Sequence, residues 1–314
     1  MATTPPAAGE SAAGPPAVLL ASELPDPALL AQMRRIEIRA RRLASTLLAG
    51  DYRSVFRGAG MEFAEAREYT AGDDVRLIDW NVTARMGTPW VKQYVEEREL
   101  PVVCAVDVSA SQLVAHSPRG RIGAAAELTA LLAFAAIAQH DRTGLLTFTD
   151  RIEEFIPPGR GTRHVLRMVR EVLHGSTEGR GTSIGTACEY LVRVLKRRTV
   201  VFLISDFADR RYDQPLRTLA QRHEVIALPL IDPLDGALPD LGIVEVEDAE
   251  RGTRLLIDTS DARFRQRYAD AAAERARARS ATLTAAAVDE VPIRLDEDLA
   301  HPLVRYFRAR AAHR

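Results

Sequence analysis

The sequence has few cysteines, few lysines and no evident long apolar run. Its 314 residues include two cysteines, Cys104 and Cys188, and two lysines, Lys92 and Lys196. Two cysteines without a C-x-x-C pair exclude a disulfide framework and suit a reducing compartment. Because we find no run of about 18 apolar residues and no secretory signal at the N-terminus, we expect no membrane span and a cytoplasmic location.

Signatures of two large enzyme classes are missing as well. The sequence contains no G-x-x-x-x-G-K-[ST] motif and no Gly-Lys pair, which argues against a P-loop nucleotide hydrolase. It also lacks H-E-x-x-H, the signature of many zinc proteases. We therefore predict that the protein is not an enzyme, and we assign no catalytic residue and no organic cofactor.

The charge balance gives no indication that a charged polymer is the partner. The net charge is -1, from 42 basic and 43 acidic residues, so no overall attraction to nucleic acid or anionic membrane is expected. One predicted helix, at residues 28–49, carries five arginines opposite its apolar face, at positions 34, 35, 39, 41 and 42. We interpret this face as solvated, with a nucleic-acid or membrane surface as the alternative.

Four parts follow one another along the chain. Residues 1–27 are rich in Ala, Pro and Gly and are predicted to be a disordered tail. Residues 28–99 combine the arginine-bearing helix with a β-rich module, in which T-A-G-D-D at 70–74 is a turn signal. Residues 100–295 alternate strands and helices, and residues 296–314 are expected to form a closing helix.

The alternation in residues 100–295 predicts an α/β fold with a mainly parallel sheet flanked by helices, a Rossmann-like arrangement. Strands are expected at 101–106, 145–148, 152–156, 199–205 and 224–230, and the runs at 101–106 and 199–205 are apolar and rich in β-branched residues. We expect P-P-G at 157–159 to end the strand at 152–156. A hairpin at 243–258 is expected at the sheet edge, followed by a last strand at 288–295.

Oxygen-bearing side chains follow two of these strands and precede one helix. Asp107, Ser109 and Ser111 come directly after the first strand, Thr182 lies in a turn before a helix, and Asp206 follows the strand at 199–205. The carboxyl ends of parallel strands meet at one edge of a sheet, where ligands bind. Oxygen donors select hard cations, so we predict Mg²⁺, with Mn²⁺ or Ca²⁺ as alternatives. Each side chain alone could equally be a helix N-cap.

The pattern D-x-S-x-S at 107–111, with the later Thr182 and the pair Ser205-Asp206, resembles the metal-ion-dependent adhesion site of von Willebrand factor A domains. That resemblance implies that Asp107, Ser109, Ser111 and Thr182 coordinate the metal and that Asp206 acts through water. The upstream stretch F-A-E-A-R-E-Y-T-A-G-D-D-V-R-L-I-D-W-N-V-T-A-R, at 63–85, is similar to the bacterial domain-of-unknown-function family 58.

Membership of that family implies a von Willebrand factor A-like protein associated with a MoxR-type AAA+ ATPase. Many of its members begin with two membrane helices, which we do not find here. Our first hypothesis is a non-catalytic module that binds a partner's acidic group through a divalent cation, with the ATPase and its client as partners. Two alternatives stay open: a metal-assisted phosphohydrolase, and a scaffold whose metal site is vestigial.

Overall fold

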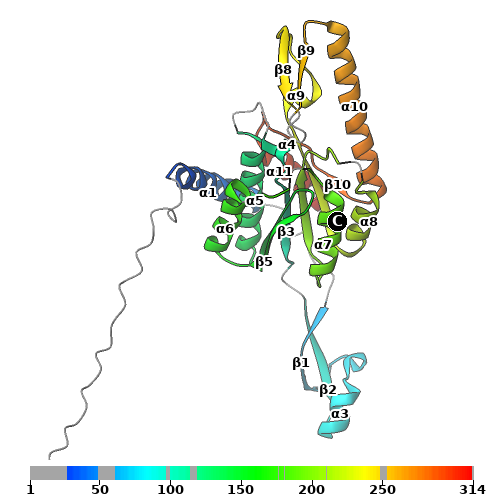
Figure 1. Cartoon of the computed structure of the whole chain (residues 1–314). Helices are drawn as coiled ribbons and strands as arrows, with labels where there is room; N and C mark the ends of the chain where they lie inside the picture. Colours follow the sequence, from blue (N-terminus) through cyan, green and yellow to red (C-terminus); the bar gives the residue numbers. More distant parts are fainter. Residues whose placement is uncertain are drawn as a thin grey trace, which may run out of the picture.

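A seven-stranded sheet forms the centre of the molecule (Figure 1). The structure is a computed structural model that describes residues 27–48, 61–96, 100–113, 119–175, 177–179, 181–209, 211–247 and 253–312. The predicted tail therefore falls almost entirely outside the described residues. The strand order is β10-β7-β6-β3-β4-β5, with β11 also on β7. Every pair in this sheet is parallel except β4 with β5, which confirms the predicted α/β fold.

Four parallel strands carry the core: β3 (Val102–Asp107), β4 (Thr143–Phe148), β6 (Val200–Ser205) and β7 (Glu224–Ile231). The first three are buried along their whole length, as continuous apolar runs predict. Alternate side chains of β3 enter two separate clusters, because successive residues of a strand face opposite sides. Both faces of the sheet are therefore covered.

One face packs against α1 (Pro27–Leu48), α5 (Arg121–Ala138), α6 (Thr162–His174) and α11 (Ala300–Ala312). The other face packs against α7 (Ile184–Val194), α8 (Asp213–Arg222) and the end of α10 (Ala262–Ala285). Two short helices, α4 (Ala110–Leu113) and α9 (Pro233–Gly236), follow β3 and β7. Both lie beyond the carboxyl ends of their strands, where the predicted site residues also lie.

The edges of the sheet differ in part from what was expected. The antiparallel strand β5 (Ile152–Gly159) continues through Pro157 and Pro158 instead of stopping before them. An edge strand accepts proline because one of its sides needs no ladder hydrogen bond. The opposite edge, beside β7, is occupied by β10 (Asp289–Glu290) and β11 (Ile293–Arg294), two short strands where one was expected.

The predicted hairpin forms, but it is not part of the main sheet. β8 (Ile243–Glu247) and β9 (Arg254–Asp258) pair only with each other. They stand beyond the body, beside the start of α10 (Figure 1). Since β10 and β11 already pair with β7, the hairpin finds no free edge there. It keeps several large apolar side chains exposed, including Ile243, Leu255 and Leu256.

The β-rich module is a second hairpin, β1 (Met61–Glu68) with β2 (Trp90–Glu96), that projects away from the body (Figure 1). Its connection contains the short helices η2 (Val75–Leu77) and α3 (Trp80–Met86). The Arg67 guanidinium binds both oxygens of Asp73, at 2.8 and 2.6 Å. Asp79 caps α3 through the amides of residues 81 and 82. These charges brace the module internally, while Trp80 is 70% exposed.

The helix α5 corrects the expectation that no apolar run of membrane-spanning length exists. By length and composition it is the one helix among the described residues that could cross a membrane. In the fold, 78% of it is buried. Its Glu127 receives ion pairs from Arg39 of α1, at 2.9 Å, and from Arg119, at 3.3 Å. The apolar side chains of α5 are therefore buried in the core of this fold.

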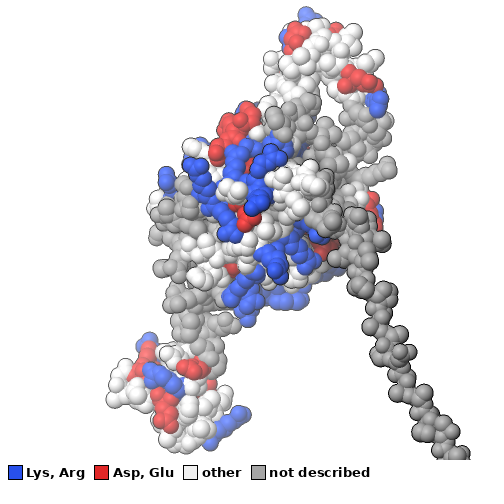
Figure 2. All heavy atoms as spheres, turned by 90° about the vertical axis from the view of Figure 1, so that its left-hand side faces the viewer, with Lys and Arg blue, Asp and Glu red and all other residues white. Residues whose placement is uncertain are grey.

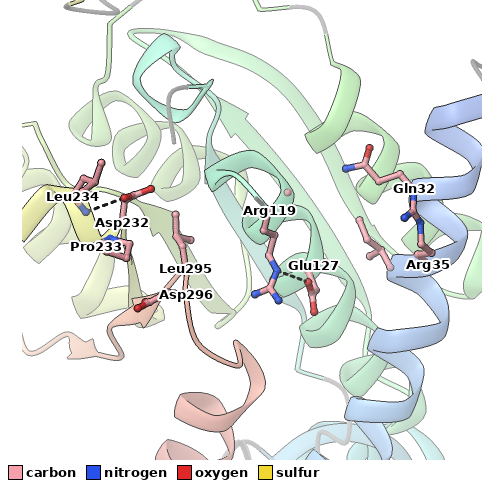
Figure 3. A pocket seen from close by; sticks show the side chains of 11 residues that line it. Gln32, Arg35, Arg119, Glu127, Asp232, Pro233, Leu234, Leu295 and Asp296 are labelled. Atoms are coloured by element: carbon pink, nitrogen blue, oxygen red, sulfur yellow. Dashed lines mark hydrogen bonds and ion pairs between the residues drawn. The ribbon is translucent and has the colours of Figure 1, made fainter. Parts of the chain in front are cut away.

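The face that carries α1 is rich in arginine (Figure 2). A cavity of about 900 Å³ opens beside this helix, between α1, α5 and the segment that carries Asp232. Figure 3 shows Arg35 of α1 on one side of this cavity, and the ion pair of Arg119 with Glu127 near its centre. The cavity lies away from the predicted metal ligands, none of which lines it.

Candidate metal-binding site

Three separate segments meet at the carboxyl edge of the sheet. Asp107 is the last residue of β3 and leads to Ser109 and to Ser111 in the short helix α4. Asp206 follows β6, which is the direct parallel neighbour of β3. Thr182 lies just before α7. The topology therefore brings together residues that are up to about a hundred positions apart in the sequence, as the order of the strands predicts.

The three hydroxyl groups form one contiguous cluster. The Oγ1 of Thr182 donates to the Oγ of Ser109 at 2.8 Å, and the Oγ atoms of Ser109 and Ser111 are 3.0 Å apart. Adjacent ligands of an octahedral Mg²⁺ with bonds near 2.1 Å lie about 3.0 Å apart. The spacing of these oxygens therefore fits neighbouring positions around one such cation.

Asp107 lies at the base of the cluster and is 1% exposed. Its Oδ1 accepts from the backbone amide of Ser109 at 3.0 Å. Its Oδ2 accepts from the Oγ of Ser205 at 2.7 Å and from the Nε2 of Gln112 at 3.3 Å. These donors hold the carboxylate in one orientation below the hydroxyl oxygens.

Burial raises the pKa of Asp107 to about 7, and the negative charge of Asp206 adds to this effect. A buried carboxylate beside a second carboxylate is costly to ionise without a positive charge nearby. A divalent cation at this position would favour the ionised form and remove the cost. The electrostatics of Asp107 and the spacing of the hydroxyl oxygens therefore both fit a divalent cation at this position.

Asp206 contributes charge without joining the hydrogen-bonded cluster. Its Oδ1 accepts from the amide of Ala208 at 3.0 Å, within a turn where Phe207 has a φ of 59°. Among the described residues, Asp206 makes no hydrogen bond to Asp107 or to the three hydroxyl groups. Four of the five predicted residues are thus linked directly, and the fifth acts on them through its charge.

The loop before Thr182 is anchored on the turn between β4 and β5. The carboxylate of Glu153 accepts from the amides of Glu178 and Gly179, at 3.1 and 2.9 Å, and from the hydroxyl of Thr149 at 2.6 Å. The amide of Ser183 then donates to the carbonyl of Thr149. These contacts determine where Thr182 enters the site.

Three residues support the site: Gln112 and Arg121 were not predicted from the sequence, and Ser205 was named only as part of the pair Ser205-Asp206. Gln112 follows the D-x-S-x-S pattern directly, and its Oε1 is buried without a hydrogen-bond partner among the described residues. Ser205 precedes Asp206 and donates to Asp107. Arg121, at the start of α5, is 8% exposed and donates to the carbonyl of Ser111 at 3.4 Å. The signal available in the sequence for Gln112 and Ser205 was that each is a polar residue directly beside a predicted ligand.

The segment G-T-S-I-G at 181–185 matches the G-x-S-x-G signature of serine hydrolases. In the structure Ser183 is instead the N-cap of α7, where its Oγ accepts from the amide of Thr186 at 3.3 Å and pairs with that residue's hydroxyl at 2.9 Å. The signature requires a strand that runs into the serine, whereas residues 181–183 follow a loop. The match is therefore explained by capping.

The fold and this cluster define an α/β protein with a candidate cation site at the carboxyl edge of its sheet. The family model described as "Protein of unknown function DUF58" matches residues 65–278, and the chain belongs to that family. It is 32% identical, over 94% of both chains, to the uncharacterized protein Rv1480 of Mycobacterium tuberculosis.

Solved structures show similarity at lower identity. An aerotolerance-related membrane protein of Bacteroides fragilis matches with a TM-score of 0.46 and 15% identity, over 68% of this chain and all of the other. The conserved hypothetical protein BatB of Bacteroides thetaiotaomicron matches with a TM-score of 0.45 and 16% identity, over 68% of this chain and 99% of the other.

The cytoplasmic location expected from the sequence has to be corrected. The Bacteroides fragilis protein that matches this chain is described as a membrane protein, which contradicts that expectation. We no longer assign this chain to the cytoplasm.

Proposed function

We propose that this chain is a non-catalytic interaction module that captures an acidic group of a partner protein through a divalent cation. One observation carries the proposal: oxygen donors from three distant segments converge at the carboxyl edge of the sheet, with hydroxyl spacings of 2.8 and 3.0 Å. The resemblance to the adhesion site of von Willebrand factor A domains supports the same function, because the same residue types occur in the same order.

In this proposal Asp107, Ser109, Ser111 and Thr182 would hold the cation, and Asp206 would act through water. When bound, the cation would supply an electrophilic position that accepts a carboxylate oxygen. Among the described residues, no three His, Cys, Asp or Glu side chains come together to hold a metal ion. Two carboxylates and neutral hydroxyls leave little excess negative charge, which suits the capture of another carboxylate.

Hydrogen bonds within the protein hold the predicted ligands in place before a partner binds. Ser205 and Gln112 already hold the Asp107 carboxylate in one orientation. Little further mobility of this side chain is therefore lost when the complex forms. The Glu153 contacts hold the loop that carries Thr182. Such preorganisation favours binding because less conformational entropy is lost on association.

Metal binding is tested by replacing Thr182 with valine, which removes one hydroxyl and keeps the shape of the side chain. Titration calorimetry with Mg²⁺ should show a loss of affinity of about tenfold or more. Thr186→Val is the matched control, since Thr186 lies in the first turn of α7 and, among the described residues, its hydroxyl pairs with that of Ser183. Equal Mg²⁺ affinity in the two variants would contradict the assignment of Thr182.

The partner we propose is an AAA+ ATPase of the MoxR type, or the client of such an ATPase, as the family resemblance implies. Immobilised protein should capture this ATPase from a native extract in Mg²⁺ and release it in chelator. Asp107→Ala should abolish the metal-dependent fraction. Capture of equal strength in chelator would show that the cation does not mediate the interaction.

A further inference from the structure

A cavity of about 380 Å³ adjoins the candidate metal site. It lies between the carboxyl ends of β6 and β7 on one side and the helices α9 and α10 on the other. Asp206 lines this cavity and also belongs to the predicted ligand set. A group that occupies the cavity would therefore lie beside a group bound at the metal site.

Arg121 lies between the segment 107–111, which carries three of the predicted ligands, and the cavity. One end of its guanidinium donates to the carbonyl of Ser111, and the other donates to Asp235 of α9 at 2.5 Å. Asp206 also acts on this arginine electrostatically. The guanidinium of Arg121 thus contacts both the segment that carries the predicted ligands Ser109 and Ser111 and the far side of the cavity, at Asp235.

The opposite wall is α10. It presents small side chains to the cavity, among them Ala272 and Ala276, and its Tyr268 donates to the carbonyl of Leu234 at 3.0 Å. Two arginines of α10 also line this wall. Arg279 is paired with Glu290 at 2.8 Å, whereas Arg275 forms no ion pair among the described residues. Arg275 is exposed and available to an incoming charge.

We propose that this cavity receives the part of the partner next to its metal-bound acidic residue, and that this part carries a second acidic group that pairs with Arg275. The inference rests on the proposed function and adds the chemistry of the partner: an acidic peptide segment with at least two carboxylates. The charge of the site supports an acidic occupant, since Asp235 is already neutralised by Arg121 and Asp206 would face the cation.

The size of the cavity supports a peptide segment over a larger body. Ligand cavities of this order, about 300–1,000 Å³, enclose groups of the size of a small ligand, and alanines of α10 line one wall. The first carboxylate would bind at the metal, the short side chains that follow would lie against α10, and the second carboxylate would reach Arg275 at the rim.

The test uses random peptides displayed on phage. They are selected on the immobilised full chain in Mg²⁺ and eluted with chelator. Eluted peptides should be enriched in pairs of acidic residues a few positions apart. Arg275→Ala should keep enrichment of one acidic residue and lose enrichment of the second. Arg277→Ala is the matched control, because this exposed arginine lies two positions further along α10 and pairs with Glu274.

A two-acid peptide from the selection should bind Arg275→Ala up to about fivefold more weakly than the wild type, the range of a partly exposed ion pair. Enrichment of a single acidic residue on the wild type would overturn this inference and leave the proposed function standing. Enrichment of pairs that survives in Arg275→Ala would also overturn it. If chelator elutes no peptides at all, the metal-dependent function itself fails.

Discussion

Replacing Asp107 with asparagine should stabilise the metal-free protein at neutral pH. The pKa of this buried carboxyl is about 7 in the folded state, against an ordinary value of 3.8. The folded state therefore keeps a proton that the unfolded state releases, and the free energy of unfolding falls as the pH rises from about 4 to 7. A difference of about 3 in pKa corresponds to about 4 kcal/mol at most.

Asparagine carries no charge, so the variant escapes this loss. It also gives up charge-assisted hydrogen bonds from Ser205 and Gln112, which reduces the expected gain to about 1–3 kcal/mol at pH 8. At pH 4 the wild-type carboxyl is protonated, and the two proteins should be nearly equal in stability. The gain of the variant should therefore grow with pH over the interval between the unfolded and folded pKa values.

Urea unfolding in chelator, at several pH values from 4 to 8, measures this difference. Mg²⁺ should then stabilise the wild type and leave Asp107→Asn unchanged, because in the proposed function only the folded wild type would bind the ion. Asp258→Asn is a control of opposite sign: hydrogen bonds from Ser260 lower the pKa of that carboxyl, so its contribution is lost as the pH falls. A wild type that is as stable as Asp107→Asn at pH 8, or a difference that does not change with pH, would refute the reasoning.

Three further predictions concern other parts of the molecule. Burial raises the pKa of both Cys104 and Cys188 to about 12, so neither thiol should react with a disulfide reagent at pH 8 until the protein is unfolded, which a thiol titration with and without denaturant measures. Met168→Ala, at a fully buried position of α6, should lower the free energy of unfolding by about 2–5 kcal/mol, measured by urea unfolding. Trp80→Phe should change stability by less than about 0.5 kcal/mol and remove the fluorescence that acrylamide quenches most readily, because this indole is 70% exposed.

Much of the central fold could be predicted from local patterns. The apolar runs that became β3, β6 and β7 are continuous because both of their faces are buried, and this signal does not depend on distant residues. The candidate site was predictable to a similar extent. Its oxygen-bearing residues follow two strands of a parallel sheet, and such strand ends share one edge.

The sheet edges were not predictable in the same way. Pro157 and Pro158 indicate the end of a strand, and only the position of β5 at an edge of the sheet makes them compatible with a strand. A strand was predicted at 288–295, but the sequence did not show that its two short pieces pair with β7 and leave the hairpin outside that edge. In both cases the deciding contact is a neighbouring strand far away in the sequence.

The sequence by itself determined the α/β class, the buried strands and the residue types at the carboxyl edge, because strand burial and donor chemistry are local properties. Tertiary structure decided which side chains surround them. Gln112 and Ser205 orient Asp107, Arg121 joins Ser111 to α9, and α10 closes a cavity beside Asp206. These contacts join segments up to about a hundred residues apart, and chain folding alone determines their distances and electrostatic environment.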